Sequence, residues 1–289
     1  MLFDLLGDLW TVPLEGGEAE RLSEGMAWDF QPRYSPDGGR ILFTSDRGGS
    51  ENLWIMEADG SGAEAFTEEG DKVTNCGAFS PDGEFIVAKR RLTDASSIGA
   101  SELWLYHRTG GKGLQVTKKD DLPEVSEPVF SHDGRYIYFS CRPARFRYDR
   151  DVNDGIYQIR RYDRENGETI VLTSRFGGAG RPTLSPDGKW LAFVTRDRLQ
   201  TCLVLHELAT GAERELACGL SRDLQESFAW AGVYPGMAFT HDGTRIALSA
   251  RGRLWTVGVE AGDWREVPFT AAVEQVVQDA LRFPHDVAG

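Results

Sequence analysis

The sequence predicts an all-β fold, a six-bladed β-propeller with four antiparallel strands in each blade. Two observations lead to this prediction: one hairpin turn recurs five times at spacings of 45–55 residues, and one strand motif recurs six times. A repeat of that length with four strands is the signature of a propeller blade. The mismatch between five turns and six strand motifs indicates that both ends of the chain contribute to one blade.

The first repeated element is a Ser-Pro-Asp-Gly turn or a close variant. Proline presets φ, aspartate bonds the backbone two residues on, and glycine accepts a positive φ. An apolar residue precedes each turn and an alternating apolar run follows it, so each turn joins two strands that face a common core. Because the turn occurs five times, its geometry is a sufficient reason for these aspartates, and no catalytic role is needed to explain them. They are Asp37, Asp82, Asp133, Asp187 and Asp242.

The second repeated element is a strand, most often Leu-Trp, that leads into a glycine-bearing turn and a more polar strand. It completes four strands in each repeat. Its copies begin at Leu9, Leu53, Leu103, Ile156, Leu203 and Leu254.

The chain is therefore predicted to be one domain, residues 1–289, with five blades at 26–70, 71–121, 122–177, 178–218 and 219–270. The remaining blade combines residues 1–25 with 271–285. The N-terminal residues supply only the later strands of this blade and not its innermost strand. We therefore expect residues 272–283 to form the innermost strand, which removes an exposed sheet edge. The apolar spacing of 272–283 also suits a short helix.

Composition excludes several function classes. The formal net charge is −13 and the isoelectric point is about 4.9, which argues against binding to nucleic acid or anionic membranes. No run approaches the roughly 20 apolar residues that span a bilayer, and the chain shows no signal peptide.

The four cysteines have no CxxC spacing, so free buried thiols are the expected state of Cys76, Cys141, Cys202 and Cys218. A Cys202–Cys218 bridge across one hairpin is the alternative.

The sequence offers little for a metal or a hydrolytic centre. The five histidines are scattered without metal-binding pairs, and no Gly-x-Ser-x-Gly elbow occurs. We therefore expect no cofactor. Asp149, Asp151 and Asn153 place oxygen ligands at alternate positions, as a calcium loop does, but the glycine and distal glutamate of an EF-hand are lacking. A solvated loop is the favoured interpretation of these three residues, and calcium is the alternative.

Residues just before each innermost strand should face the mouth of the central channel, where a propeller usually binds. A small polar ligand, a peptide end or a partner loop would suit their mixture of carboxylates, arginines and aromatics. A buried hydrogen-bonded network that plugs the channel is the interpretation we favour, because paired charges often only satisfy one another. The candidates are Trp28, Asp29, Gln31, Asn75, Glu124, Glu127, Arg181, Arg222, Glu226 and Tyr234.

Seven segments of the chain carry a resemblance to a known family: residues 3–10, 31–38, 43–49, 102–107, 222–226, 232–237 and 281–284. Through these segments the chain resembles the TolB-like propeller repeat, a relative of the WD repeat. It is most similar to the N-terminal propeller of bacterial metal-dependent amidohydrolases. In those enzymes a barrel with a His-x-His motif follows the position of Phe283-Pro284, and no such motif occurs here.

The resemblance implies a non-catalytic module for protein–protein or ligand binding, the accessory domain of an amidohydrolase-like enzyme, with no membrane insertion. It favours a periplasmic or secreted location. One alternative is a free-standing TolB-like interaction protein of the envelope. A second is a propeller enzyme or lectin that works from its channel.

Overall fold

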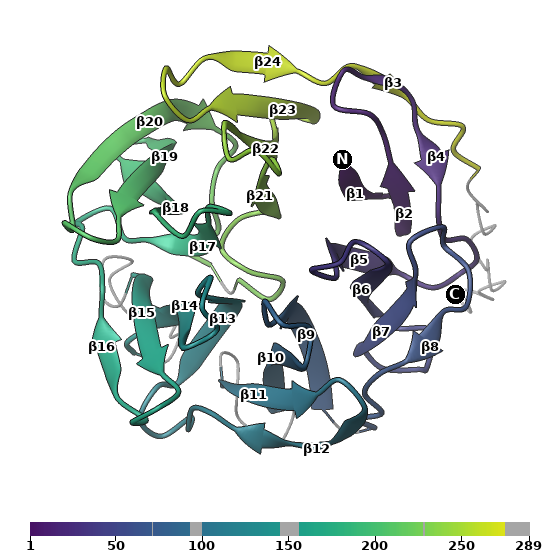
Figure 1. The fold of residues 1–289 in the computed structure, drawn as a ribbon, viewed down its shortest axis with the longest axis horizontal. Helices are drawn as coiled ribbons and strands as arrows, with labels where there is room; N and C mark the ends of the chain where they lie inside the picture. Colours follow the sequence, from purple (N-terminus) through teal and green to yellow (C-terminus); the bar gives the residue numbers. More distant parts are fainter. Residues whose placement is uncertain (71, 93–99, 145–155, 228, 275–289) are drawn as a thin grey trace, which may run out of the picture.

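The computed structural model describes residues 1–70, 72–92, 100–144, 156–227 and 229–274. Strands in these ranges form six blades around a central channel, and none of these residues lies in a helix (Figure 1). The predicted all-β, six-bladed propeller is confirmed. Within the same ranges, no helix is long and apolar enough to cross a membrane.

Five blades each contain four antiparallel strands, ordered from the channel to the rim. The second blade holds β5 (Asp29–Tyr34), β6 (Arg40–Ser45), β7 (Asn52–Glu57) and β8 (Glu64–Ala65). The third holds β9 (Lys72–Phe79), β10 (Phe85–Leu92), β11 (Ser101–His107) and β12 (Gly110–Gln115). The fourth holds β13 (Glu124–Phe130), β14 (Tyr136–Arg142), β15 (Gln158–Asp163) and β16 (Thr169–Val171).

The fifth blade holds β17 (Gly180–Leu184), β18 (Trp190–Asp197), β19 (Gln200–Glu207) and β20 (Glu213–Leu220). The sixth holds β21 (Met237–Phe239), β22 (Arg245–Ala250), β23 (Arg253–Gly258) and β24 (Trp264–Glu266).

The first blade is built from both ends of the chain. Its antiparallel strands are β1 (Leu2–Leu5), β2 (Asp8–Thr11) and β4 (Glu20–Arg21), which occupy the second to fourth positions of a blade. At the rim, β3 (Gly17–Glu18) pairs in parallel with β25 (Phe269–Thr270). Residues 17–18 and 269–270, from the first and last parts of the described chain, therefore meet at the perimeter. Residues 272–274 form no strand, and the rest of the predicted innermost strand, 275–283, lies outside the described residues.

Serine and aspartate together build each repeated turn. In the second blade, Asp37 Oδ1 accepts hydrogen bonds from the Ser35 hydroxyl and from the Gly39 N–H at 3.1 Å, while Gly38 has a φ of 72°. The equivalent bonds recur at Asp82, Asp133 and Asp187, and threonine replaces serine beside Asp242. These bonds favour the ionised carboxyl, so the pKa of each of the five aspartates is lowered.

The innermost strands of four blades contain a β-bulge at one equivalent position, six residues before the turn aspartate. The bulge residue adopts a positive φ of 55–58° and shifts the register of the ladder. A bulge re-aims its side chain, so the repeat presents four different side chains at one level of the channel. They are Gln31, Cys76, Glu127 and Arg181.

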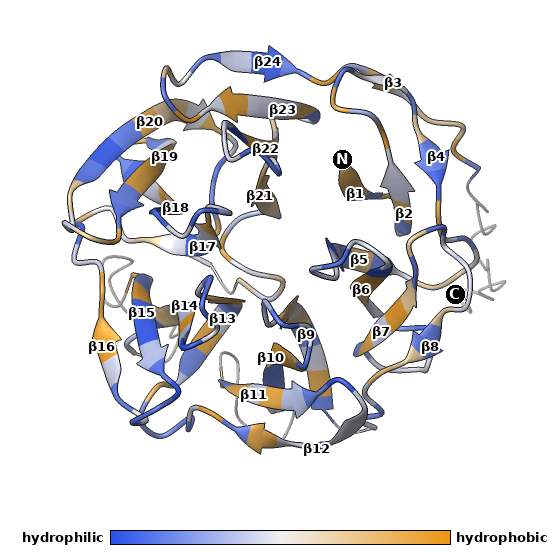
Figure 2. Cartoon of the chain, viewed as in Figure 1, coloured by the Kyte–Doolittle hydropathy of each residue, from blue (hydrophilic) through white to orange (hydrophobic). Residues whose placement is uncertain are grey.

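Apolar side chains fill the spaces between neighbouring blades. Between the second and third blades, Leu42, Leu53, Ile86 and Tyr106 form one buried cluster, and similar clusters follow around the ring. Apolar residues accordingly occur in strands of every blade (Figure 2). The core of this propeller is therefore a ring of interblade layers that surrounds the polar channel.

Cys202 and Cys218 form a disulfide, so the expected free thiols are wrong for this pair. The register of β19 and β20 sets the two residues opposite each other, with their Cα atoms 4.0 Å apart. Cys76 and Cys141 are free and buried, and burial raises the pKa of the Cys141 thiol to about 12.

The disulfide predicts a thiol count. The unreduced, denatured protein should react with Ellman's reagent at two thiols, Cys76 and Cys141. A Cys202→Ala/Cys218→Ala variant should lose about 3 kcal/mol of unfolding free energy, because a loop of this size is no longer closed in the unfolded chain. Four reactive thiols without reductant would contradict the pairing.

The turns predict an acid dependence of stability. The Thr240 and Thr244 hydroxyls and the Thr244 N–H lower the pKa of Asp242 from 3.8 to about 2. Since the folded pKa is depressed, the stabilisation is complete above the unfolded value and is lost as the pH falls through the folded value. When the pH falls from neutral to about 2, the free energy of unfolding should therefore decrease less in Asp242→Asn than in wild type. Urea titrations at each pH measure this decrease. Identical pH profiles for the two proteins would contradict this assignment, and Asp187→Asn provides a replicate in a second turn.

Candidate functional site

The propeller has two faces, named here by their loops. The entry face carries the starts of the innermost strands and the loops between second and third strands, and the turn face carries the Ser-Pro-Asp-Gly turns. On the entry face, the long connection between β20 and β21, residues 221–236, reaches the centre of the ring (Figure 1). We call its described residues, 221–227 and 229–236, the crossing segment.

Side chains from three blades hold the backbone of the crossing segment. Gln31 Nε2 donates to the Ala231 carbonyl at 2.7 Å, and the buried Lys89 Nζ donates to the Trp230 carbonyl at 3.0 Å. Arg142 donates to the carbonyls of Gln225 and Ser227. The Trp230 ring also stacks on Phe30, with ring centroids 5.5 Å apart. The crossing segment is therefore an anchored plug over the channel.

Glu127 is the central anchor of this plug. Its carboxylate is fully buried and accepts hydrogen bonds from the Val233 N–H at 2.6 Å, the Arg181 N–H at 2.7 Å and the Ser140 hydroxyl. Gly232 lies directly against it, and a Cβ on that residue would come within 2.4 Å of Glu127 Oε1. A glycine is needed there both for this close approach and for the φ of 109°.

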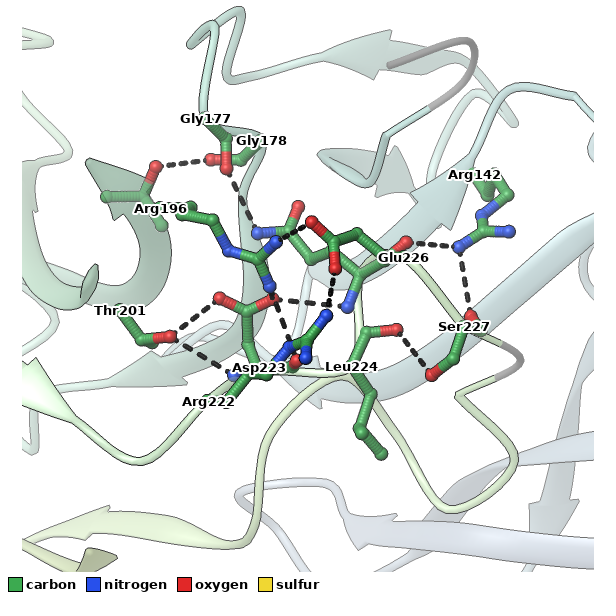
Figure 3. Close-up of polar contacts among 12 residues, drawn as sticks. Arg142, Gly177, Gly178, Arg196, Thr201, Arg222, Asp223, Leu224, Glu226 and Ser227 are labelled. Atoms are coloured by element: carbon green, nitrogen blue, oxygen red, sulfur yellow. Dashed lines mark hydrogen bonds and ion pairs between the residues drawn. The ribbon is translucent and has the colours of Figure 1, made fainter. Parts of the chain in front are cut away.

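A second cluster fixes the start of the crossing segment (Figure 3). The buried Asp223 pairs with the Arg196 guanidinium and accepts a hydrogen bond from the Thr201 hydroxyl at 2.8 Å. Glu226 bonds both Arg196 and Arg222, and the bond from Arg222 is the main cause that lowers the pKa of the Glu226 carboxyl. The outer part of this cluster reaches solvent at Arg222.

A third cluster lies where β13 and β14 meet the loop before β15. The Tyr157 hydroxyl donates to the buried Glu124, and Arg142 Nε lies 3.6 Å from the other carboxylate oxygen. Burial raises the pKa of Glu124, and burial followed by the Glu124 charge raises that of Tyr157 well above its ordinary value. The Arg142 guanidinium also covers the Tyr157 ring at 4.8 Å.

The structure groups the ten predicted channel residues in five places. Gln31, Glu127 and Arg181 surround the crossing segment, and Tyr234 is a buried residue of that segment whose hydroxyl donates to the Ser249 carbonyl. Arg222 and Glu226 belong to the second cluster and Glu124 to the third. Asp29 is buried and paired with Arg47 beside the exposed Trp28, and Asn75 lies 3.4 Å from Glu51. Most of these side chains thus take part in internal contacts, as a network that plugs the channel would require.

Sequence reasoning missed Lys89, Arg142 and Arg196, which hold the plug, and Asp223, the residue of the plug that pairs with Arg196. The signal that could have found them is the length of the connection at residues 221–236. A long polar segment between two blades must satisfy its own backbone groups, and these charged side chains do so.

The described residues offer one group with metal-ligand atoms close together: Cys202, Glu215 and Cys218. Its two sulfurs are joined in the disulfide, so they supply no thiolate ligands. The calcium candidates Asp149, Asp151 and Asn153 lie outside the described residues.

Known proteins resemble this chain in sequence and fold. Residues 5–126 match the family described as TolB beta propeller domain. The chain is 33% identical over 259 residues to Tricorn protease homolog 1 of Streptomyces coelicolor, covering 86% of this chain and 22% of that protein. It is 29% identical over 195 residues to the uncharacterized peptidase YuxL of Bacillus subtilis, and the match covers 56% of this chain and 28% of that protein. The chain therefore spans less than a third of either curated relative.

Among solved structures, the crystal structure of TolB from Acinetobacter baumannii superposes with a TM-score of 0.67 at 22% identity. The match covers 90% of this chain and 62% of that one. At this identity, the likeness establishes a shared fold.

The anchoring role of Glu127 predicts the effect of removing its charge. Glu127→Gln should lower the free energy of unfolding by about 3 kcal/mol, because a buried acceptor of several N–H groups is replaced by a group that also donates. Hydrogen exchange at Val233 and Tyr234 should accelerate at the same time. Glu226→Gln, on the partly exposed side of the same segment, is the matched control and should change stability by less than about 1 kcal/mol. Equal exchange in the two variants would show that Glu127 does not anchor the segment.

Proposed function

Because this chain is a TolB-like six-bladed β-propeller, we propose that it is a non-catalytic binding module whose entry face docks onto another protein domain. The domain we propose is a hydrolase, of the amidohydrolase-like class suggested by the sequence resemblance. The proposal rests on one observation above all, the distribution of exposed apolar side chains.

Six large apolar side chains are exposed in loops of the entry face. Topology assigns them to this face, because each lies before an innermost strand or between a second and a third strand. Phe176 and Leu199 are 93% and 98% exposed. Exposed apolar groups gathered on one face are typical of protein interaction sites. The six are Leu6, Met26, Trp28, Phe176, Leu199 and Leu224.

The plug supports docking rather than channel chemistry on this face. The crossing segment fills the centre with backbone groups that are already bonded to Gln31, Lys89 and Glu127. A partner would therefore meet a preformed surface, which lowers the entropic cost of association. An enzyme or lectin that worked from the channel would first have to displace these contacts.

Two relatives support a hydrolytic partner. The regions similar to this chain make up 22% and 28% of proteins named for protease or peptidase activity. A free-standing TolB-like interaction protein is the second candidate, and the likeness to the Acinetobacter TolB structure, which covers 62% of that chain, supports it.

Site-specific crosslinking tests the proposal. A photoreactive amino acid at Leu199 should crosslink to a partner in the host cell, and mass spectrometry should identify a hydrolase domain. Leu114, exposed on the outermost strand β12 at 66%, is the control position and should give little product. A non-hydrolytic partner would favour the second candidate. Equal yields at both positions, or none at Leu199, would contradict docking through the entry face.

A further inference from the structure

The channel opens at the turn face, opposite the crossing segment, into a pocket of about 260 Å³. Innermost strands and turns of the second to fifth blades line it. Exposed prolines and a histidine of the turns form its rim, at Pro36, Pro81 and His132. Its volume lies just below the roughly 300–1,000 Å³ of sites for drug-sized ligands, so it suits a small molecule.

The walls of this pocket are mainly apolar, and they contain one positive charge. Phe79, Phe130 and Leu184 supply the apolar surface, and Arg33 supplies the charge. Pockets of this composition bind an apolar body and orient it through a single polar group.

Arg33 has no partner for its charge among the described residues: no hydrogen bond or ion pair joins its guanidinium to any of them. It follows the bulge at Gln31 on β5 and is half-buried. Burial, and next the charge of Arg181, lower its pKa to about 10, so the group stays cationic at neutral pH. Most other arginines in the described structure pair with a carboxylate or a carbonyl, such as Arg47 with Asp29 and Arg135 with Asp163.

The carboxylate whose charge acts on Arg33 is already engaged. The charge of Glu127 favours the cationic guanidinium, and the charge of Arg181 opposes it. Glu127 accepts hydrogen bonds from the N–H groups of Val233 and Arg181 and from the Ser140 hydroxyl. Its carboxylate is therefore used to anchor the plug and not to pair with Arg33. The turn-face side of the channel is thus left with an unpaired positive charge, in a chain whose net charge is −13.

We propose that this pocket binds a small organic acid, with its carboxylate on Arg33 and its apolar body against Phe79, Phe130 and Leu184. The guanidinium fork matches a carboxylate in two parallel hydrogen bonds. One guanidinium suits a single negative charge, and the net charge of −13 disfavours polyanions. The site lies on the face opposite the docking surface, so it stands independently of the proposed function.

Isothermal titration calorimetry with N-acetylphenylalanine and its uncharged amide tests this site on the wild-type protein. The acid should bind at least tenfold more tightly than the amide, because only the acid pairs with Arg33. A tetrapeptide that ends in phenylalanine, with a free C-terminus, tests whether the site takes chain ends instead. Equal binding of acid and amide, or binding of the tetrapeptide alone, would overturn the proposal.

Variants separate the charge from the fold. Arg33→Gln should weaken binding of N-acetylphenylalanine at least tenfold, and Arg33→Lys should retain part of the affinity. Arg40→Gln is the matched control, since Arg40 is an exposed arginine beside the same turn that does not line the pocket. Circular dichroism melting should show all three variants folded. Unchanged affinity in Arg33→Gln would rule out this carboxylate site.

Discussion

The buried carboxylate of Glu127 joins three parts of the propeller that lie far apart in the chain. It accepts N–H groups from Arg181 in the next blade and from Val233, 106 residues away in the crossing segment. A charge in this position is tolerated only because several donors surround it. The crossing segment closes the entry face, where the loops carry exposed apolar side chains. The proposed docking surface therefore depends on Glu127 together with the other anchors of this segment.

The bulge position shows how a repeated backbone supports different chemistry around one channel. In four blades, the residue at the bulge position has the same positive φ and lies at the same level of the channel. The side chains at this position nevertheless differ: they are Gln31, Cys76, Glu127 and Arg181. Gln31 and Glu127 bind the plug, whereas the segment after Gln31 places Arg33 in the pocket at the turn face. One face of the channel is thereby closed and the other left open and cationic, and the two binding roles proposed for this chain both derive from one repeat.

Charge pairing explains how an acidic chain keeps a cationic pocket. Several arginines of the entry face are held by carboxylates or carbonyls, as Arg196 is by Asp223 and Arg142 by the crossing segment. Arg33 is separated from such partners because Glu127 faces the plug. Burial of an unpaired charge costs stability, and a structure that retains one commonly does so at a functional site.

Sequence alone determined the blade. Each Ser-Pro-Asp-Gly turn and each Leu-Trp strand is specified by neighbours within a few residues, so the count of six blades and the blade shared by both ends were predictable from local chemistry. Three of the predicted channel residues, Gln31, Glu127 and Arg181, occupy the bulge position, because that position follows from the repeat. Only the tertiary structure decided the Cys202–Cys218 pairing, the rim contact of β3 with β25, the plug at Glu127 and the unpaired state of Arg33. Each depends on strand register or on contacts between distant segments, which no local pattern encodes.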